Sequence, residues 1–147
     1  MVTLQIQRVR DNSDLPLPTY QTAGASGLDL RADIVETIVI KPLERRLVPT
    51  GLAIAIPSGF EGQIRARSGL AVKHGLAMVN APGTIDADYR GELQVILINL
   101  GADDFVLRRG DRMAQLVIQK VERPQIVEVQ TLDDTTRGAQ GFGSTGV

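Results

Sequence analysis

A carboxylate and an aromatic ring stand three residues apart in the middle of the chain, where Asp86 and Tyr89 belong to the segment 85–92. Asp88 lies between them, and in extended geometry Asp86 and Asp88 face the same way. A carboxylate of this kind can take a proton from a water molecule, and a ring beside it can stack on a flat ligand. Both aspartates can equally be turn residues that hydrogen-bond to nearby backbone. Spacing alone leaves the two interpretations open.

A second candidate site is the sequence Arg67-Ser68-Gly69, which follows a predicted strand and stands where a short helix is expected to begin. Arginine supplies a fork of donors, and the first N–H groups of a helical turn have no partner in the helix, so the segment suits an anion. The simpler alternative is a serine N-cap beside a solvated arginine.

The third candidate is the glycine-rich segment 137–146, which ends in hydroxyl residues. Successive backbone N–H groups in such a loop can form an anion nest, although no Lys-Ser/Thr pair follows as in a Walker A loop. Composition also fits a disordered tail, but a solvated tail has no need of the aromatic residue Phe142. Together the segment 85–92 and this glycine-rich segment predict an enzyme that holds a nucleotide, stacks on it and attacks a phosphate.

The bulk composition excludes several other classes of protein. The 147 residues fit one domain, and the net charge of −1 gives no basic field for a nucleic acid polymer. Without cysteine, and with His74 as the single histidine, thiolate and His-cluster metal sites are excluded and a Ser-His-Asp triad is disfavoured. Neither a signal peptide nor an apolar run long enough to span a bilayer is seen, so we expect a soluble, cytoplasmic protein without membrane contacts.

Short alternating or β-branched segments are common in the chain, while helical periodicity is scarce. This pattern predicts an all-β barrel or sandwich with one short helical insert at residues 70–74. The segment 131–147 contains little that could anchor a core, so we expect a β domain over residues 1–130 followed by a flexible arm over 131–147. The expected strands are 2–8, 35–40, 52–56, 60–67, 93–100, 105–107 and 113–121.

Five segments resemble, in order and in separation, the five motifs of the trimeric dUTP pyrophosphatases, or dUTPases. They are residues 25–30, 67–71, 80–92, 109–116 and 137–146, and together they span nearly the whole chain. Each motif is weak by itself, whereas the ordered set of five is highly specific.

The resemblance implies a jelly-roll-like β domain that forms a homotrimer with three shared active sites. It implies hydrolysis of dUTP to dUMP and pyrophosphate, which keeps uracil out of DNA and supplies dUMP for dTTP synthesis. It also implies Mg²⁺, held mainly by the substrate phosphates and not directly by protein ligands.

Residue by residue, the resemblance gives Asp86 the role of the carboxylate that deprotonates the water attacking the α-phosphorus. Tyr89 matches the ring under the deoxyribose, and Asp29 matches an aspartate of structural or metal-water supporting type. The remaining matches are a uracil pocket of Asn80, Gly83, Thr84, Ile85 and Gln94; phosphate-side groups Arg67, Ser68, Gly69 and Gln115; and a C-terminal lid of Arg137, Phe142, Gly143, Ser144 and Thr145.

Three positions depart from the family pattern. Gln140 stands where the lid usually has the first of two glycines, which matters if that position needs a positive φ. Ala66 replaces a common proline and Ser26 replaces a common alanine, and we expect both changes to be minor.

Two competing functions follow from the same residues. A dCTP deaminase of related trimeric fold would act on a similar nucleotide, but it typically needs a glutamate in the pocket to activate water at the cytosine ring. A non-catalytic trimeric protein could use the pocket only to sense nucleotide, which the retained Asp86 disfavours. Ammonia release from dCTP and pyrophosphate release from dUTP separate these alternatives from the hydrolase.

Overall fold

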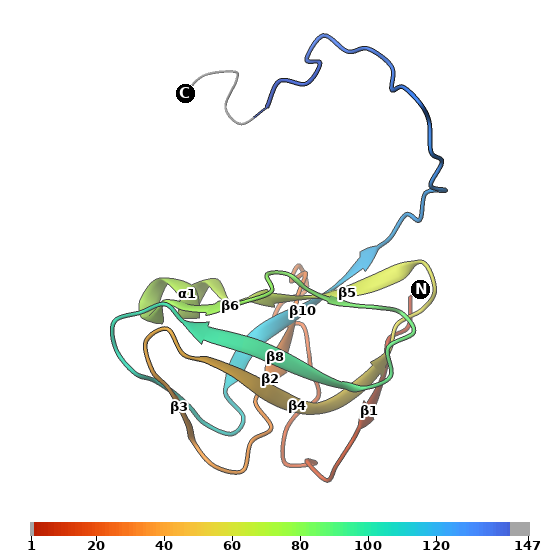
Figure 1. The fold of residues 1–147 in the computed structure, drawn as a ribbon. Helices are drawn as coiled ribbons and strands as arrows, with labels where there is room; N and C mark the ends of the chain where they lie inside the picture. Colours follow the sequence, from red (N-terminus) through yellow and green to blue (C-terminus); the bar gives the residue numbers. More distant parts are fainter. Residues whose placement is uncertain (1, 142–147) are drawn as a thin grey trace.

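Short strands and one brief helix make up the structure, a computed structural model that describes residues 2–141 (Figure 1). Alternating and β-branched residues favour strands, and Gly and Pro separate them. In chain order the elements are β1 (Gln5–Arg8), β2 (Leu28–Arg31), β3 (Ile38–Ile40), β4 (Arg45–Ala55), β5 (Phe60–Ala66), α1 (Ser68–His74), β6 (Leu76–Met78), β7 (Gly83–Ile85), β8 (Glu92–Asn99), β9 (Phe105–Leu107) and β10 (Arg112–Lys120).

The strands form two four-stranded sheets and one two-stranded sheet, and every pair is antiparallel. The first sheet has the order β1-β4-β8-β6, the second has the order β2-β10-β5-β7, and the small sheet pairs β3 with β9. Buried residues of both larger sheets share one apolar cluster. The fold is therefore an all-β sandwich, as the sequence predicts.

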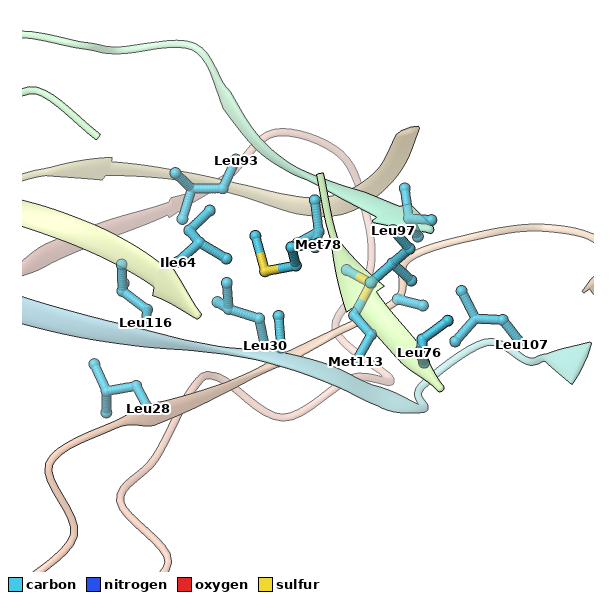
Figure 2. Packing of buried hydrophobic residues seen from close by; sticks show 14 of the residues in the cluster. Leu28, Leu30, Ile64, Leu76, Met78, Leu93, Leu97, Leu107, Met113 and Leu116 are labelled. Carbon is cyan, nitrogen blue, oxygen red and sulfur yellow. The ribbon is translucent and has the colours of Figure 1, made fainter. Parts of the chain in front are cut away.

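The core lies between the two larger sheets, where leucine, isoleucine and methionine side chains interdigitate (Figure 2). Leu93, Val95 and Leu97 of β8 point inward and are almost fully buried. Burying one such side chain contributes about 1.5–3 kcal/mol. The sequence predicts a buried strand here, but only one face of β8 is in the core, because Ile96 and Ile98 on the other face are half-buried.

The outer face of the first sheet carries an apolar strip that we define as Leu47, Ala77, Val79, Ile96 and Ile98. Leu47 lies opposite Ile96, and Ala77 lies opposite Ile98, so these side chains share one face of the sheet. Leu47 and Val79 are 59% and 54% exposed. A strip of this kind, placed on a sheet and open to solvent, is typical of a protein interface.

Most predicted elements are confirmed, with shifts at their ends. The predicted helix at 70–74 lies within α1, and the strand at 105–107 coincides with β9. The prediction was wrong for β4, which begins at Arg45 rather than at residue 52. The short strands β2, β6 and β7 were not predicted as separate strands.

Beyond β10 the chain leaves the two sheets, and residues 121–141 form neither helix nor strand (Figure 1). Nearly all of these residues are exposed. Within residues 2–141 we find no helix that has both the length and the apolar character needed to cross a bilayer.

Candidate active site

Asp29, in the middle of β2, gathers side chains from two other motifs. Its carboxylate is buried and accepts a hydrogen bond from Nη1 of Arg112 at 3.0 Å and one from Nε2 of Gln115 at 3.5 Å. Nε of Arg67 lies 3.7 Å from the same carboxylate, and Nη1 of Arg67 donates to the carbonyl of Arg112 at 2.8 Å. The buried carboxylate thus fixes two guanidinium groups and one amide in a single cluster, which we call the arginine cluster.

The position of Arg67 differs from the one expected if Ser68 capped α1 and Arg67 were solvated. The N-cap position of α1 is Arg67, not Ser68, and no side chain caps the helix. The guanidinium is not merely solvated, because Asp29 and the Arg112 carbonyl hold it. Ser68 and Gly69 are exposed next to it at the start of α1. The structure therefore brings Arg67, Ser68 and Gly69 together at the arginine cluster.

A cleft of about 540 Å³ opens beside the arginine cluster, between α1 and the turn that joins β9 to β10. Arg67, Arg108 and Arg112 line it, together with His74 and the carboxylates of Asp104 and Asp111, among others. Guanidinium groups bind phosphates through pairs of parallel N–H donors. The cleft is consequently suited to the negatively charged part of a ligand.

The predicted pocket residues lie on and around β7, at the edge of the second sheet. The Asn80 side chain approaches Gly83 so closely that a Cβ built there would stand 3.0 Å from Nδ2 of Asn80. Thr84 is exposed, and Ile85 packs against the core. Gln94 is also exposed, but it lies on β8 in the other large sheet.

Asp86 and Tyr89 occupy the two ends of one turn directly after β7. The Tyr89 N–H donates to the Asp86 carbonyl at 3.1 Å, and the Tyr89 hydroxyl donates to the Glu92 carbonyl at 3.1 Å. Ala87 packs against the core, while the side chains of Asp86 and Asp88 are exposed. The turn thus presents a carboxylate and a ring to solvent from one rigid piece of backbone.

The arginine cluster and this turn lie at opposite ends of β5. Strand β7 runs antiparallel to β5, with Ile85 opposite Gly62, so Asp86 lies beyond the level of Gly62. The five residue steps from Gly62 to Arg67 span roughly 16 Å in extended geometry. Arg67 also points toward β10 and β2, across β5 from β7. Within a single chain, the candidate base Asp86 therefore lies apart from the candidate phosphate-binding groups.

The arm contributes one predicted residue to the described part of the chain. Arg137 is exposed, and its Nε donates to the Gln140 carbonyl at 2.9 Å, so this contact stays within the arm. Leu43 is the one non-glycine residue with positive φ among residues 2–141, so Gln140 does not adopt the left-handed conformation here. The predicted lid residues Phe142, Gly143, Ser144 and Thr145 lie outside the described residues.

The carboxylates of the site are compatible with a metal ion that is held mostly by the phosphates of a bound substrate. Within residues 2–141 no group of three or more His, Asp or Glu side chains is arranged to hold a metal ion. Asp29 is occupied by the arginine cluster, whereas the carboxylates of Asp86 and Asp88, on the turn after β7, are accessible. Magnesium keeps several waters and commonly uses one or two protein carboxylates plus substrate phosphates, so this donor set is compatible with it.

Several important side chains were not among the predicted site residues. Arg112 completes the arginine cluster, and its place at the start of β10, in the same motif as Gln115, is the signal that could have identified it. Arg10, Asp33 and Arg109 form a further ion-pair network. Its members are 23 and 76 residues apart in sequence, so no local pattern reveals it.

Comparison with known proteins assigns this geometry to a family. The dUTPase family model matches residues 13–146. The deoxyuridine 5'-triphosphate nucleotidohydrolase of Caulobacter vibrioides is 55% identical, with 99% of this chain and 96% of that protein covered. The fold is similar to that of a mutant dUTPase of Staphylococcus bacteriophage 80alpha with dUpNHpp, with a TM-score of 0.88, 27% identity and 99% of each chain covered.

A second solved structure is that of a mutant dUTPase of phage phi11 of S. aureus, described as revealing the coordination of a structural Mg(II) ion. It has a TM-score of 0.79 and 25% identity, and the match covers 90% of this chain and 99% of that one. These likenesses identify the all-β sandwich as the jelly-roll-like fold expected from the sequence. With the family model matching almost the whole length, the chain belongs to the dUTPase family.

Proposed function

We propose that the protein hydrolyses dUTP to dUMP and pyrophosphate. The observation that carries this proposal is the turn after β7, which presents the Asp86 carboxylate and the Tyr89 ring together to solvent in a chain of the dUTPase family. A protein that only sensed nucleotide would need the ring but not an accessible base. We assign the activity to the cytoplasm, where it keeps uracil out of DNA and supplies dUMP for dTTP synthesis.

Asp86 acts as the general base in the proposed mechanism. Its exposed carboxylate orients a water molecule in line with the α-phosphorus and takes a proton as the water attacks. Pyrophosphate then leaves from the opposite side. General-base assistance of this type contributes about 10²–10⁴ in rate. The turn hydrogen bond from the Tyr89 N–H to the Asp86 carbonyl supports the role, because it fixes the backbone that carries the base.

The arginine cluster binds the phosphate chain in this proposal. Arg67 and Gln115, already oriented by Asp29, donate to phosphate oxygens with help from Ser68 and Gly69. Arg112 adds charge on the same side of the cleft. The C-terminal lid then closes, with Arg137 and residues 143–145 over the terminal phosphate and Phe142 on the uracil ring.

Magnesium completes the charge balance in this proposal. When bound, Mg²⁺ would supply positive charge to the phosphate oxygens. The exposed carboxylates of Asp86 and Asp88 would help to hold it through its water shell.

Selectivity for uracil arises along β7 and its flanking residues. Asn80 and the backbone of residues 83–85 and 94 present a fixed pattern of donors and acceptors to the uracil edge. Cytosine reverses one donor and one acceptor, and a site built for one pattern can reject the other by about 10⁴. Tyr89 lies under the deoxyribose and leaves no room for a 2′-hydroxyl.

We further propose that the protein is a homotrimer in which each active site takes Asp86 and Arg67 from different chains. The separation of these two residues along β5 supports this arrangement, because each would reach a shared substrate more directly from a neighbouring copy. The apolar strip on the outer face of the first sheet supports it as well, since packing against another copy would cover Leu47 and Val79.

A substrate panel tests the proposed function. The purified protein is incubated with dUTP, dCTP, dTTP or UTP, with and without Mg²⁺, and pyrophosphate and ammonia are measured. The proposal expects pyrophosphate from dUTP in the presence of Mg²⁺ and little turnover of the others. Ammonia from dCTP would instead indicate a deaminase, and binding of dUTP without any product would indicate a sensor.

A further inference from the structure

The proposed mechanism leaves unused a network of ion pairs that ends at the turn carrying Tyr89. Glu92 begins β8, and its two carboxylate oxygens accept hydrogen bonds from Nη1 and Nη2 of Arg10, both at 2.8 Å. Nη1 of Arg10 also donates to Asp33 at 2.7 Å, and Arg109 binds the other oxygen of Asp33. Asp33 is only 1% exposed at its side chain, which makes it a fixed anchor for both arginines.

Glu92 makes two separate contacts, one through its backbone and one through its side chain. Its backbone carbonyl accepts the hydrogen bond from the Tyr89 hydroxyl at 3.1 Å, while its side chain is held by Arg10. The ring also lies against Gly91, where an added Cβ would stand 2.3 Å from the Tyr89 hydroxyl oxygen. The position of an otherwise exposed ring therefore depends on where the backbone of Gly91 and Glu92 is held.

The strand ladder is irregular beside that backbone, although Glu92 itself pairs with Ala53 of β4. The pairing of β4 with β8 changes register between Pro49 and Ala53, opposite the beginning of β8. Gly51, inside this irregularity, turns its N–H to the Glu92 carboxylate at 2.7 Å. Its φ is +70°, and a Cβ there would stand 2.1 Å from an Asp33 oxygen, so only glycine fits. Side-chain bonds to Glu92 thus supplement the irregular ladder at this point.

We propose that Glu92 and Arg10 are positioning residues that hold the Tyr89 ring and thereby set the discrimination between deoxyribose and ribose. The inference rests on the proposed function, in which Tyr89 lies under the sugar. Arg10 binds both oxygens of Glu92, which fixes the orientation of the carboxylate as well as its distance. A loosened Glu92 carbonyl lets the ring move, and a displaced ring makes space for a 2′-hydroxyl.

The test compares kcat and KM for dUTP and UTP in the wild-type protein and in Glu92→Gln, with the unfolding midpoint measured in parallel. Glu92→Gln keeps an acceptor for the Gly51 N–H but loses the charged fork to Arg10. We expect the preference for dUTP over UTP to fall by about 3-fold to 10-fold, the range of one neutral hydrogen bond. The matched control is Glu44→Gln, which removes the same charge from the exposed pair with Arg46 and should leave the preference unchanged.

A double-mutant cycle separates positioning from general destabilisation. In Tyr89→Phe the hydroxyl that donates to the Glu92 carbonyl is absent, so adding Glu92→Gln should change the dUTP preference no further. An equal further loss in the double mutant, or an unchanged preference in folded Glu92→Gln, would overturn the inference.

If Glu92→Gln does not fold, Arg10→Lys takes its place, because lysine keeps the charge but not the fork. An unchanged preference in that variant overturns the inference in the same way. Failure of the proposed function would give a different result, because the wild-type protein itself would then not hydrolyse dUTP.

Discussion

At the scale of single residues, the account depends most on Asp86. We predict that Asp86→Asn lowers kcat for dUTP by about 10²–10⁴, because the amide cannot accept the proton of the attacking water. Nucleotide binding should be retained, since asparagine has the same shape and the turn bond uses only the backbone. Steady-state kinetics and calorimetric titration with a non-hydrolysable analogue check both parts. The matched control is Asp103→Asn, which changes an exposed carboxylate away from the turn after β7.

Asp33 gives a prediction for the pH dependence of stability. Burial by itself raises the pKa of Asp33, but hydrogen bonds from Arg10, Asn12 and Arg109 outweigh it and hold the pKa below its usual value. The stabilisation is therefore present above the unfolded-state pKa of about 4 and is lost as the pH falls through the lower folded-state value. The wild-type protein should lose stability as it is acidified below about pH 4.

The variant Asp33→Asn removes that dependence. We expect it to cost about 1–3 kcal/mol at pH 7, less than a fully buried pair, because Arg10 and Arg109 are 43% and 34% exposed. Denaturant unfolding at pH 7 and at acid pH, at fixed protein concentration, measures the difference. Asp14→Asn is the control, since Asp14 pairs with the same Arg109 from an exposed position. Equal losses in both variants would contradict the anchoring role of Asp33.

Residue types and order singled out Asp86, Tyr89 and Arg67 as candidate site residues, and these assignments stay predictions. Asp86 and Tyr89 are close in sequence, so their shared turn follows from local chemistry. The bond from Arg112 to Asp29 joins residues 83 apart and exists only because β10 pairs with β2. The sequence contains both residues but not the strand register that brings them together.

At the scale of elements, the longer strands were predictable, whereas only some of the strands of three or four residues were. Alternation identified β5 and an almost wholly apolar run identified β8, whereas β7 has three residues and gains its place by pairing with β5. Proline normally marks the end of a strand or its edge. Pro49 nevertheless lies inside β4, next to the irregular register, and for this reason the beginning of that strand was missed.

The C-terminal arm gives the prediction that belongs to this scale. Removing residues 137–147 should leave the thermal unfolding midpoint unchanged, because residues 121–141 form no strand or helix. The value of kcat/KM for dUTP should fall by about 10-fold to 100-fold, since one charge-assisted hydrogen bond from Arg137 is lost with the lid. Arg123→Ala, an arm residue before the lid, serves as the control. Normal turnover by the shortened protein would refute the lid role.

At the scale of the whole molecule, the two halves of the proposed site lie at opposite ends of β5. Mixing two inactive variants tests whether neighbouring chains combine them. Asp86→Asn and Arg67→Ala are each purified, unfolded together in equal amounts and refolded. If one site takes Asp86 and Arg67 from different chains of a random trimer, about a quarter of the sites contain both native residues and activity returns. No recovery in verified mixed trimers would mean that both residues come from one chain.

Hydrolysis of dUTP in ¹⁸O-labelled water tests the central claim most directly, because it reports which phosphorus the water attacks. The wild-type protein and Asp86→Asn are incubated with dUTP and Mg²⁺, and the products are analysed by mass spectrometry. The account predicts that the label enters dUMP and not pyrophosphate, and that Asp86→Asn forms labelled dUMP far more slowly. Label in pyrophosphate, or labelled dUMP formed at the wild-type rate by Asp86→Asn, would contradict it.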